Sequence, residues 1–406
     1  MIILDDSHVS DRMSDYLQQS GQPVLDTAMA RTIADGGCRL NIVAEDEAVS
    51  RIEAGERLYA MSESHLDWVL SHINNDSLCD AIRICKDKES MRIALQPLYP
   101  DCFFQACDID ELLSMDFPKA ALPFVLKPSV GFLSVGVYTV RSRDDWDAAL
   151  LDIRRNKEEW AKWYDDSVIA PSHFIMESLV EGTEYAIDAY FDDDGHARVL
   201  NVLRHDFADP HDTGDRLYYT GVSVMRAQMN RMQDFLDSAN RSMHMRAFPV
   251  HVEVRDTGDM IFPIEFNPLR FAGLGGTEVS RFAYGFFTFD MYLRDEVPDW
   301  ERLLGAGEGD DGAAAETAAA AAARPDATDD DLFCMSVLNP PANTPHDAQF
   351  DYDALWAQVG HPLALDRFDY ASTGIFGFLF WKTNAVDEAE RTWLLKNDLG
   401  EFIITA

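Results

Sequence analysis

The sequence lacks the features of a membrane, secreted or zinc-binding protein. Its N-terminus has no basic segment followed by an apolar stretch, and no window approaches the roughly 18 consecutive apolar residues of a membrane helix. The six cysteines form no CxxC pair and have no matching histidine cluster. Scattered cysteines are typical of reduced, buried thiols. We therefore expect a soluble protein of the cytoplasm that has no membrane partner.

Basic residues are scarce relative to acidic ones. The chain has 34 Lys and Arg against 71 Asp and Glu, a net charge of -37. Such a surface repels phosphate backbones, which argues against nucleic-acid binding. The excess of acids is typical of a soluble surface, and a specific acidic interaction surface is the alternative. With 406 residues, of which 47% are hydrophobic, we expect two or three compact units.

The first 86 residues contain no GxGxxG, so nothing indicates dinucleotide binding. Short apolar runs alternate with helical patterns, including a helix expected over His65–Ile73. The apolar runs lie at 23–26, 38–44, 57–62 and 81–85. This alternation of apolar runs and helical patterns predicts a Rossmann-like α/β unit with a parallel sheet at 1–86.

Paired strands and long helices follow over 87–300. We expect strands at 124–128, 135–140, 174–180, 184–191 and 197–205, a hairpin at 249–267, and helices at 144–163 and 225–245. Residues 305–331 are Ala- and Gly-rich and predict a linker or loop. Residues 332–406 predict a C-terminal α/β region, with a strand at 374–382 and a helix at 387–398.

A lysine ends the strand at 124–128, and a loop with serines and glycines follows it. Lys127 could neutralise phosphate charge, while backbone N–H groups of the loop approach a polyphosphate. The loop residues are Ser129, Gly131, Ser134 and Gly136. An ordinary hairpin is the alternative interpretation.

Two glutamates, Glu177 and Glu184, are seven residues apart and each adjoins an apolar strand. Carboxylates can accept hydrogen bonds from adenine amino and ribose hydroxyl groups. Solvated strand edges are the alternative.

The hairpin at 249–267 has a register that burial should determine. A three-residue loop, Thr257–Asp259, pairs Val250 with Phe266 and makes one face wholly apolar. The other face then carries His251 opposite Glu265, with Glu253 diagonal to it and Asn267 at the strand end.

Two carboxylates and an amide oxygen on one face suit a hard divalent cation. Without a cation, packing the like charges of Glu253 and Glu265 so closely is costly. The predicted metal ligands are Glu253, Glu265 and Asn267, unless this is only the polar face of a sheet. Arg270 follows, with flexible glycines after it, and could clamp a substrate carboxylate or an acyl phosphate.

These motifs together resemble the ATP-grasp superfamily over roughly residues 23–300. The family's first lysine is matched by Lys88 in KDK, where Lys86 is a competing candidate. The remaining motifs are matched by Lys127 with its loop, by Glu177 and Glu184 for adenine and ribose, and by Glu253, Glu265 and Asn267 for the metals. The resemblance implies a Rossmann-like unit, two α+β subdomains that hold ATP between them, and Mg²⁺, with Mn²⁺ as an alternative. It also implies a homodimer as one candidate oligomeric state.

The resemblance also implies an ATP-dependent ligase. It would activate a small-molecule carboxylate as an acyl phosphate and couple it to an amine or another nucleophile. Lys88, Lys127 and the metals would offset phosphate charge, and Arg270 would steady the acyl phosphate. His205 and His251 are candidates for substrate contact or for structural roles. A phosphotransferase on the same fold and a non-catalytic nucleotide-binding protein are the alternatives.

Overall fold

The structure, a computed structural model, describes residues 1–130, 136–163, 173–209, 212, 214–305, 329–341 and 343–404. Two predicted loop residues, Gly131 and Ser134, lie outside the described residues, as does most of the low-complexity segment at 305–331.

The N-terminal unit is built on a four-stranded parallel sheet, in the order β3-β2-β1-β4. The strands are β1 (Ile2–Ile3), β2 (Pro23–Leu25), β3 (Asn41–Val43) and β4 (Tyr59–Ala60), and the helices between them are α1 (Asp11–Ser20), α2 (Ala28–Asp35) and α3 (Glu45–Glu53). Parallel strands need such crossover helices. The predicted α/β unit with a parallel sheet is therefore confirmed.

The last apolar run of this unit, 81–85, was predicted wrongly as a strand. It lies inside α5 (Asp76–Lys86), which follows α4 (Leu66–His72). Asn75 caps α5, and Cys79, Ile82 and Cys85 recur at helical spacing on its buried side. A short apolar run cannot distinguish a strand from one buried face of a helix, and the cap decided the outcome.

A four-stranded antiparallel sheet in the order β5-β8-β6-β7 forms a second unit. Its strands are β5 (Phe104–Asp108), β6 (Phe124–Pro128), β7 (Tyr138–Val140) and β8 (His173–Ser178). One face packs against α8 (Arg143–Trp163) through Phe124, Phe174 and Trp146. Because side chains alternate along a strand, Lys127 and Glu177 lie on the other face.

An eight-stranded antiparallel sheet forms the centre of the molecule, in the order β13-β12-β9-β10-β11-β14-β17-β16. Its strands are β9 (Thr183–Phe191), β10 (Ala197–Asp206), β11 (Leu217–Thr220), β12 (Phe248–Asp256), β13 (Ile261–Pro268), β14 (Asp331–Val337), β16 (Pro362–Arg367) and β17 (Gly377–Asn384). Three of these strands come from the C-terminal region, which therefore extends the central sheet.

One face of this sheet is covered by α9 (Val222–Met243), whose Met225, Met232 and Leu236 are buried in the main core. The remaining helices are α6 (Lys88–Leu95), α7 (Ile109–Ser114), α10 (Val279–Tyr284), α11 (Thr288–Arg294), α12 (Trp300–Leu303), α13 (Tyr352–Gln358), α14 (Tyr370–Thr373) and α15 (Glu388–Lys396). A small two-stranded sheet pairs β15 (Gln349–Phe350) with β18 (Ile403–Ile404).

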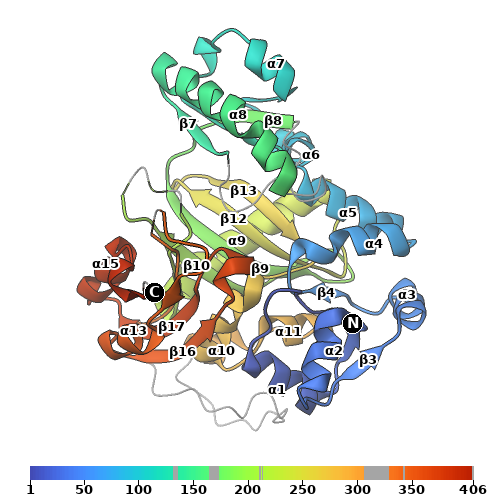
Figure 1. The fold of residues 1–406 in the computed structure, drawn as a ribbon. Coiled ribbons are helices and arrows are strands. Elements are labelled where there is room, and N and C mark those ends of the chain that lie inside the picture. Colours follow the sequence, from blue (N-terminus) through green and yellow to red (C-terminus); the bar gives the residue numbers. More distant parts are fainter. Residues whose placement is uncertain are drawn as a thin grey trace.

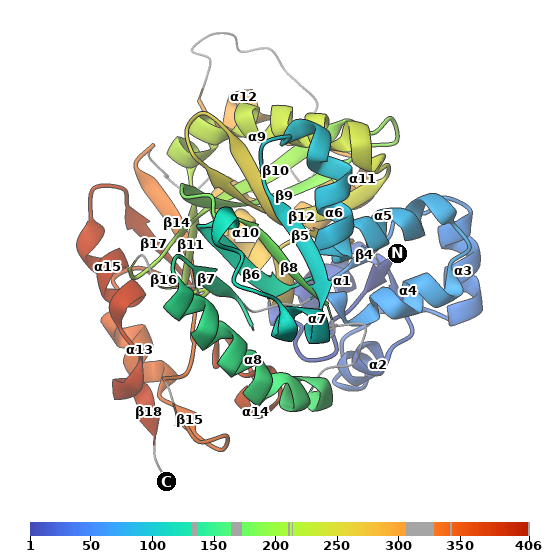
Figure 2. The same cartoon turned by 90° about the horizontal axis from the view of Figure 1, so that it is seen from above.

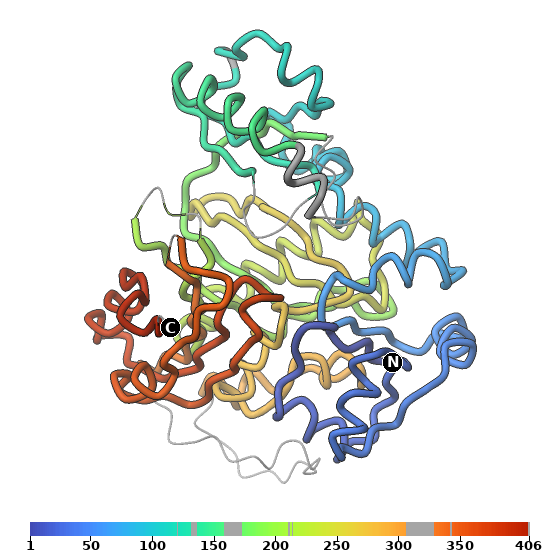
Figure 3. The backbone as a smooth tube through the Cα atoms, viewed as in Figure 1, coloured from blue at the N-terminus to red at the C-terminus, as the bar shows by residue number. Residues whose placement is uncertain are grey.

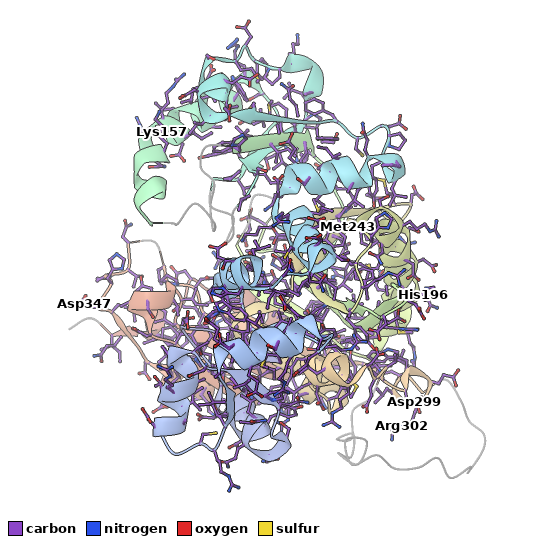
Figure 4. The ribbon with its side chains drawn as sticks, turned by 90° about the vertical axis from the view of Figure 1, so that its right-hand side faces the viewer. Lys157, His196, Met243, Asp299, Arg302 and Asp347 are labelled. Carbon is purple, nitrogen blue, oxygen red and sulfur yellow. The ribbon has the colours of Figure 1, made fainter. Side chains whose placement is uncertain are left out.

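The four-stranded sheet and α8 lie at one end of the molecule, beyond the hairpin β12–β13 (Figure 1). Seen from above, this unit lies between the N-terminal unit and the C-terminal helices (Figure 2). The two termini lie on opposite sides of the central sheet (Figure 3). Lys157 of α8 and Asp299 near α12 mark opposite ends of the molecule (Figure 4). The hairpin β12–β13 forms one edge of the central sheet, where β13 contacts α5 and α6.

None of the described helices is both long and apolar enough to cross a membrane.

Candidate active site

The register of the hairpin β12–β13 differs by two residues from the predicted one. Val252 pairs with Phe266, and the loop from Thr257 to Met260 has four residues, closed by hydrogen bonds between Thr257 and Met260. A bulge after Glu253 supplies the second added residue. The pairing of Val250 with Phe266 was therefore wrong, because burial fixed which side chains face inward but not the loop length.

From the bulge to Pro268 the shift is two residues, so His251, Glu253, Glu265 and Asn267 keep their predicted face. Between the loop and the bulge the shift is only one residue, so Phe262 lies opposite Arg255 and not on the apolar face. Glu253 now lies directly opposite Glu265, and His251 directly opposite Asn267. Asn267 Nδ2 donates a hydrogen bond to Glu265 Oε1 at 2.9 Å, which leaves the amide oxygen as an acceptor for a cation. The two carboxylates and the amide are thus adjacent on one face.

The two carboxylates of the hairpin have opposite electrostatic states. Burial raises the pKa of Glu253 well above its ordinary value, and the charges of Glu265 and Asp215 raise it further. Burial also opposes ionisation of Glu265, but Lys88 and the Asn267 amide bring its pKa down to about 2. Glu253 is therefore an acid without enough positive charge nearby, which a divalent cation would supply.

Lys88 reaches the hairpin from the start of α6. Asp87 caps that helix and also accepts a hydrogen bond from the Ser129 hydroxyl, while Lys88 N donates to Ser129 O at 3.0 Å. Lys88 Nζ lies 3.1 Å from Glu265 Oε2. Burial lowers the pKa of Lys88, but Glu265, Glu63 and Glu177 together raise it above its ordinary value. Ser129 therefore anchors the helix that presents Lys88.

The competing lysine, Lys86, has a different partner. Its ammonium pairs with Glu63 of the N-terminal unit. Arg270 binds the same carboxylate, with Nη2 at 3.2 Å from Glu63 Oε1. Burial opposes ionisation of Glu63, but Arg270 and Lys86 hold its pKa below the ordinary value. The structure thus separates the two lysines of KDK, with Lys88 at the carboxylates of the hairpin.

Lys127 and Glu177 form a buried ion pair on the inner face of the four-stranded sheet. Lys127 Nζ lies 2.6 Å from Glu177 Oε1, and Arg92 Nε lies 2.6 Å from Glu177 Oε2. Burial opposes ionisation of Glu177, yet Lys127 and Arg92 lower its pKa to about 2. Burial lowers the pKa of Lys127 despite this carboxylate. The positive charges here exceed the negative ones.

Arg92 is a site residue that the sequence analysis missed. It follows Lys88 by four residues on α6, so both side chains leave the same helix face. Its Nη2 donates to Pro263 O at 2.7 Å, and its guanidinium lies 4.5 Å from the Phe262 ring centroid. Nη1 is buried without a hydrogen-bond partner among the described residues. The helical spacing of Lys88 and Arg92 was the available signal.

Glu184 lies on the same face of the large sheet as the hairpin acids. Its Oε1 accepts a hydrogen bond from His205 Nδ1 at 2.6 Å, and its Oε2 lies 2.6 Å from Arg255. The His205 ring stacks on Tyr218 at 4.1 Å, and Tyr218 donates to Asp215 at 2.5 Å. His205 therefore has a structural partner in Glu184.

His251 is held by a buried carboxylate that the sequence analysis did not single out. His251 Nδ1 lies 2.7 Å from Asp188 Oδ1, and Nε2 lies 3.8 Å from Glu253 Oε1. Asp188 is fully buried and also accepts hydrogen bonds from Ala272 N and from the Thr277 hydroxyl. Asp188 thus ties the hairpin to the segment after Arg270. Its place four residues after Glu184, on the same strand face, was the available signal.

The donor set fits a magnesium site. Oxygen ligands from two carboxylates and one amide suit Mg²⁺, which also takes substrate phosphates and water as ligands. Among the described residues, no three His, Cys, Asp or Glu side chains surround a common metal position. The set here has only two such side chains together with Asn267. Glu253, Glu265 and Asn267 stay the predicted ligands.

Gly136 is the last residue of the predicted phosphate loop and has a φ of 72°. A residue with a side chain adopts this value only under strain. The predicted nucleotide contacts of Ser129, Ser134, Gly136, Glu177 and Glu184 stay predictions. The structure does bring Lys88, Lys127 and Glu177 together with the hairpin acids, since Lys127 affects the pKa of Glu265 and Glu177 that of Lys88.

Comparisons with known proteins agree with this arrangement. The family model described as an ATP-grasp domain matches residues 120–278. No curated protein matches the sequence.

Solved structures resemble the whole chain at low sequence identity. The L-amino acid ligase from Bacillus licheniformis is 13% identical, with 99% of this chain and 97% of that chain covered and a TM-score of 0.62. The N5-carboxyaminoimidazole synthase from Aspergillus clavatus, in complex with ADP and 5-aminoimidazole ribonucleotide, is 14% identical, with coverage of 99% and 98% and a TM-score of 0.59. Biotin carboxylase from Campylobacter jejuni is 10% identical, with coverage of 94% and 87% and a TM-score of 0.58. The chain therefore contains an ATP-grasp domain within a multi-domain ATP-grasp fold.

Proposed function

We propose that the protein is an ATP-dependent ligase that joins a small-molecule carboxylate to an amine. The observation that carries this proposal is the facing arrangement of charge. Lys88, Lys127 and Arg92 supply positive charge from one side, and Glu253, Glu265 and Asn267 supply oxygen ligands from the other. A nucleotide triphosphate with its divalent cations needs both.

In the first step, the substrate carboxylate oxygen attacks the γ-phosphorus of ATP. The bond to the β,γ-bridging oxygen breaks, which gives an acyl phosphate and ADP. Lys88 and Lys127 would offset the negative charge that develops on the transferred group and on ADP. Glu253, Glu265 and Asn267 would hold Mg²⁺, which would supply positive charge and Lewis acidity at the phosphates. The chain itself would hold the phosphates in line with the carboxylate.

In the second step, the amine nitrogen attacks the acyl carbon. The amide forms, inorganic phosphate leaves, and the amine proton passes to solvent or to a nearby base. Arg270 would bind the acyl phosphate through its guanidinium, while Glu63 holds that side chain in place. No side-chain nucleophile is required.

The names of similar structures support this class of reaction. They include an amino acid ligase, a carboxyaminoimidazole synthase crystallised with ADP, and biotin carboxylase. Their low identity leaves this chain's carboxylate and amine open. The coarser conclusion, an ATP-using ligase, therefore carries more support than any particular substrate.

A phosphate-release assay tests the proposal. The full-length protein is incubated with Mg-ATP and a panel of carboxylates, each with and without amines or amino acids. A ligase releases phosphate only when both substrates are present and forms an amide that mass spectrometry detects. A phosphorylated product formed without an amine would instead identify a phosphotransferase.

Glu265→Gln is the diagnostic variant. It keeps the side-chain shape but removes the negative charge of a predicted ligand, so we expect turnover to fall by about 10³-fold. Glu301→Gln on the exposed part of α12 is the matched control and should keep full activity. Full Mg²⁺-dependent turnover in Glu265→Gln would show that the metal assignment is wrong.

A further inference from the structure

A second cavity lies on the face of the central sheet opposite the candidate site. Its volume is about 510 Å³, within the range of small-molecule sites. Its floor is a row of three side chains from adjacent strands, since Arg204 pairs with Tyr185 on one side and with Tyr219 on the other. Glu184 and His205, which belong to the candidate site, are the next residues along these strands and point to the opposite face.

The guanidinium of Arg204 is oriented by its neighbours but keeps free donors. Arg204 Nε lies 2.9 Å from Asp206 Oδ1, and Asp206 Oδ2 accepts a hydrogen bond from Tyr219 at 3.1 Å. Both terminal amino groups of Arg204 lack a hydrogen-bond partner within the described part of the chain. A fixed guanidinium with free donors is suited to bind a carboxylate.

Gln228 of α9 contributes a hydrogen-bond acceptor that no donor of the described structure reaches. Its Nε2 donates to the Tyr185 hydroxyl at 3.1 Å. Its Oε1 is buried and has no hydrogen-bond partner in the described structure. A buried acceptor without a donor is unfavourable, so a ligand with an N–H group would stabilise this side of the cavity.

The remaining walls are apolar or balanced in charge. Val224 and Ala227 of α9 face Leu332 and Leu395 across the cavity. The charged residues Arg204, Arg391, Asp206 and Glu388 line it in equal numbers of each sign. Arg391 donates to backbone carbonyls at the start of α15, so it serves mainly to hold that helix. A balanced lining favours a neutral or zwitterionic ligand over a simple anion.

We infer that this cavity binds a free α-amino acid with an apolar side chain. The carboxylate would bind the Arg204 guanidinium, and the ammonium group would donate to Gln228 Oε1. The side chain would pack against the walls formed by Val224, Ala227, Leu332 and Leu395. This ligand site is separate from the proposed ATP site and does not depend on the reaction proposed there.

Isothermal titration calorimetry of the full-length protein tests the inference with three related compounds. Leucine has all three groups, 4-methylpentanoate lacks the amine, and 3-methylbutylamine lacks the carboxylate. We expect leucine to bind at least about tenfold more tightly than either analogue, because each analogue leaves one polar group of the site unpaired. No binding of leucine, or equal binding of 4-methylpentanoate, would overturn the inference.

Variants locate the bound leucine. Arg204→Met should weaken leucine binding about tenfold or more, and Ala227→Trp should block it by filling the cavity from the helix surface. Arg241→Met, on an exposed part of α9, is the matched control and should bind normally. Differential scanning calorimetry confirms that each variant is folded.

Two variants of the candidate active site separate the two sites. Lys127→Ala and Glu265→Gln should leave the leucine affinity of the cavity unchanged. If these variants abolish leucine binding while Arg204→Met and Ala227→Trp retain it, leucine occupies the active site and the cavity assignment is wrong.

Discussion

The two sides of the candidate active site have opposite charge balance. On the side of α6 and the four-stranded sheet, Lys127 and Arg92 share one carboxylate, Glu177. On the side of the large sheet, Glu253 lies opposite Glu265, and Lys88 pairs with Glu265. Negative phosphates would complete the first side and divalent cations the second. The site therefore has opposed charge imbalance on its two sides, which phosphates and cations together would neutralise.

After Glu265→Gln, the largest effect should follow from removing charge on the positive side. Lys127→Ala takes away a buried ammonium, and we expect kcat to fall by about 10²–10³-fold with a weaker affinity for ATP. Phosphate release and nucleotide titration measure the two effects. Lys396→Ala, an exposed lysine on α15, is the matched control. Unchanged ATP affinity in Lys127→Ala would remove this lysine from the phosphate site.

The next largest effect should follow from removing Arg270, the predicted contact of the acyl phosphate. Arg270→Ala removes the guanidinium that would hold the acyl phosphate, and we expect kcat/KM to fall by about 10²-fold. ATP affinity should change little, because Lys88 and Lys127 remain. Steady-state kinetics and nucleotide titration separate the two quantities. An equal loss of ATP affinity would place Arg270 at the nucleotide.

A smaller effect should follow from Glu63→Gln, which leaves Arg270 in place but loosens it. Glu63 binds both Arg270 and Lys86 from the N-terminal unit, so the neutral amide weakens two ion pairs. We expect kcat/KM to fall by roughly tenfold, less than for Arg270→Ala. Activity equal to that of the unchanged protein would show that Glu63 does not position Arg270.

The smallest effect concerns stability and pH. The raised pKa of Glu253 means that the folded, cation-free protein binds its proton more tightly than the unfolded chain does. Its contribution to stability therefore falls as pH rises from about 4.5 toward the folded pKa. Glu253→Gln should remove this loss and melt a few degrees higher near pH 7 without Mg²⁺.

Glu265 and Glu177 should behave in the opposite way. Their pKa values of about 2 give stability that is present above pH 4.5 and is lost as pH falls toward 2. Melting curves from pH 4 to pH 8, with and without Mg²⁺ and ATP, measure both trends. A Glu253→Gln variant that melts lower than the unchanged protein at pH 7 without Mg²⁺ would contradict the proposed shortage of positive charge.

Much of this site could be read from the sequence because its motifs are local. The face that carries Glu253, Glu265 and Asn267 follows from side-chain alternation alone. The residue-by-residue pairing of β12 with β13 could not be predicted, because no sequence pattern indicates the four-residue loop or the bulge. The strand expected at 81–85 failed for a related reason, since Asn75 decided in favour of a helix.

Contacts between segments that are distant in the chain could not be predicted from the sequence. The choice between Lys86 and Lys88 rested on which carboxylate each lysine meets, and Glu63 and Glu265 are more than 200 residues apart in the chain. Spacing from Lys88 and from Glu184 was the local signal for Arg92 and Asp188, but their partners Glu177 and His251 lie far along the chain.

The sequence by itself determined which residue types share a strand face or a helix face, since backbone geometry repeats every two or 3.6 residues. The ATP-grasp motifs and their order were recognised separately, from their resemblance to that family. Only the tertiary structure decided how the hairpin is paired, which lysine meets its acids, and that a cavity lies behind the same strands. Those features depend on loop closure and on packing between distant segments, which no local pattern encodes.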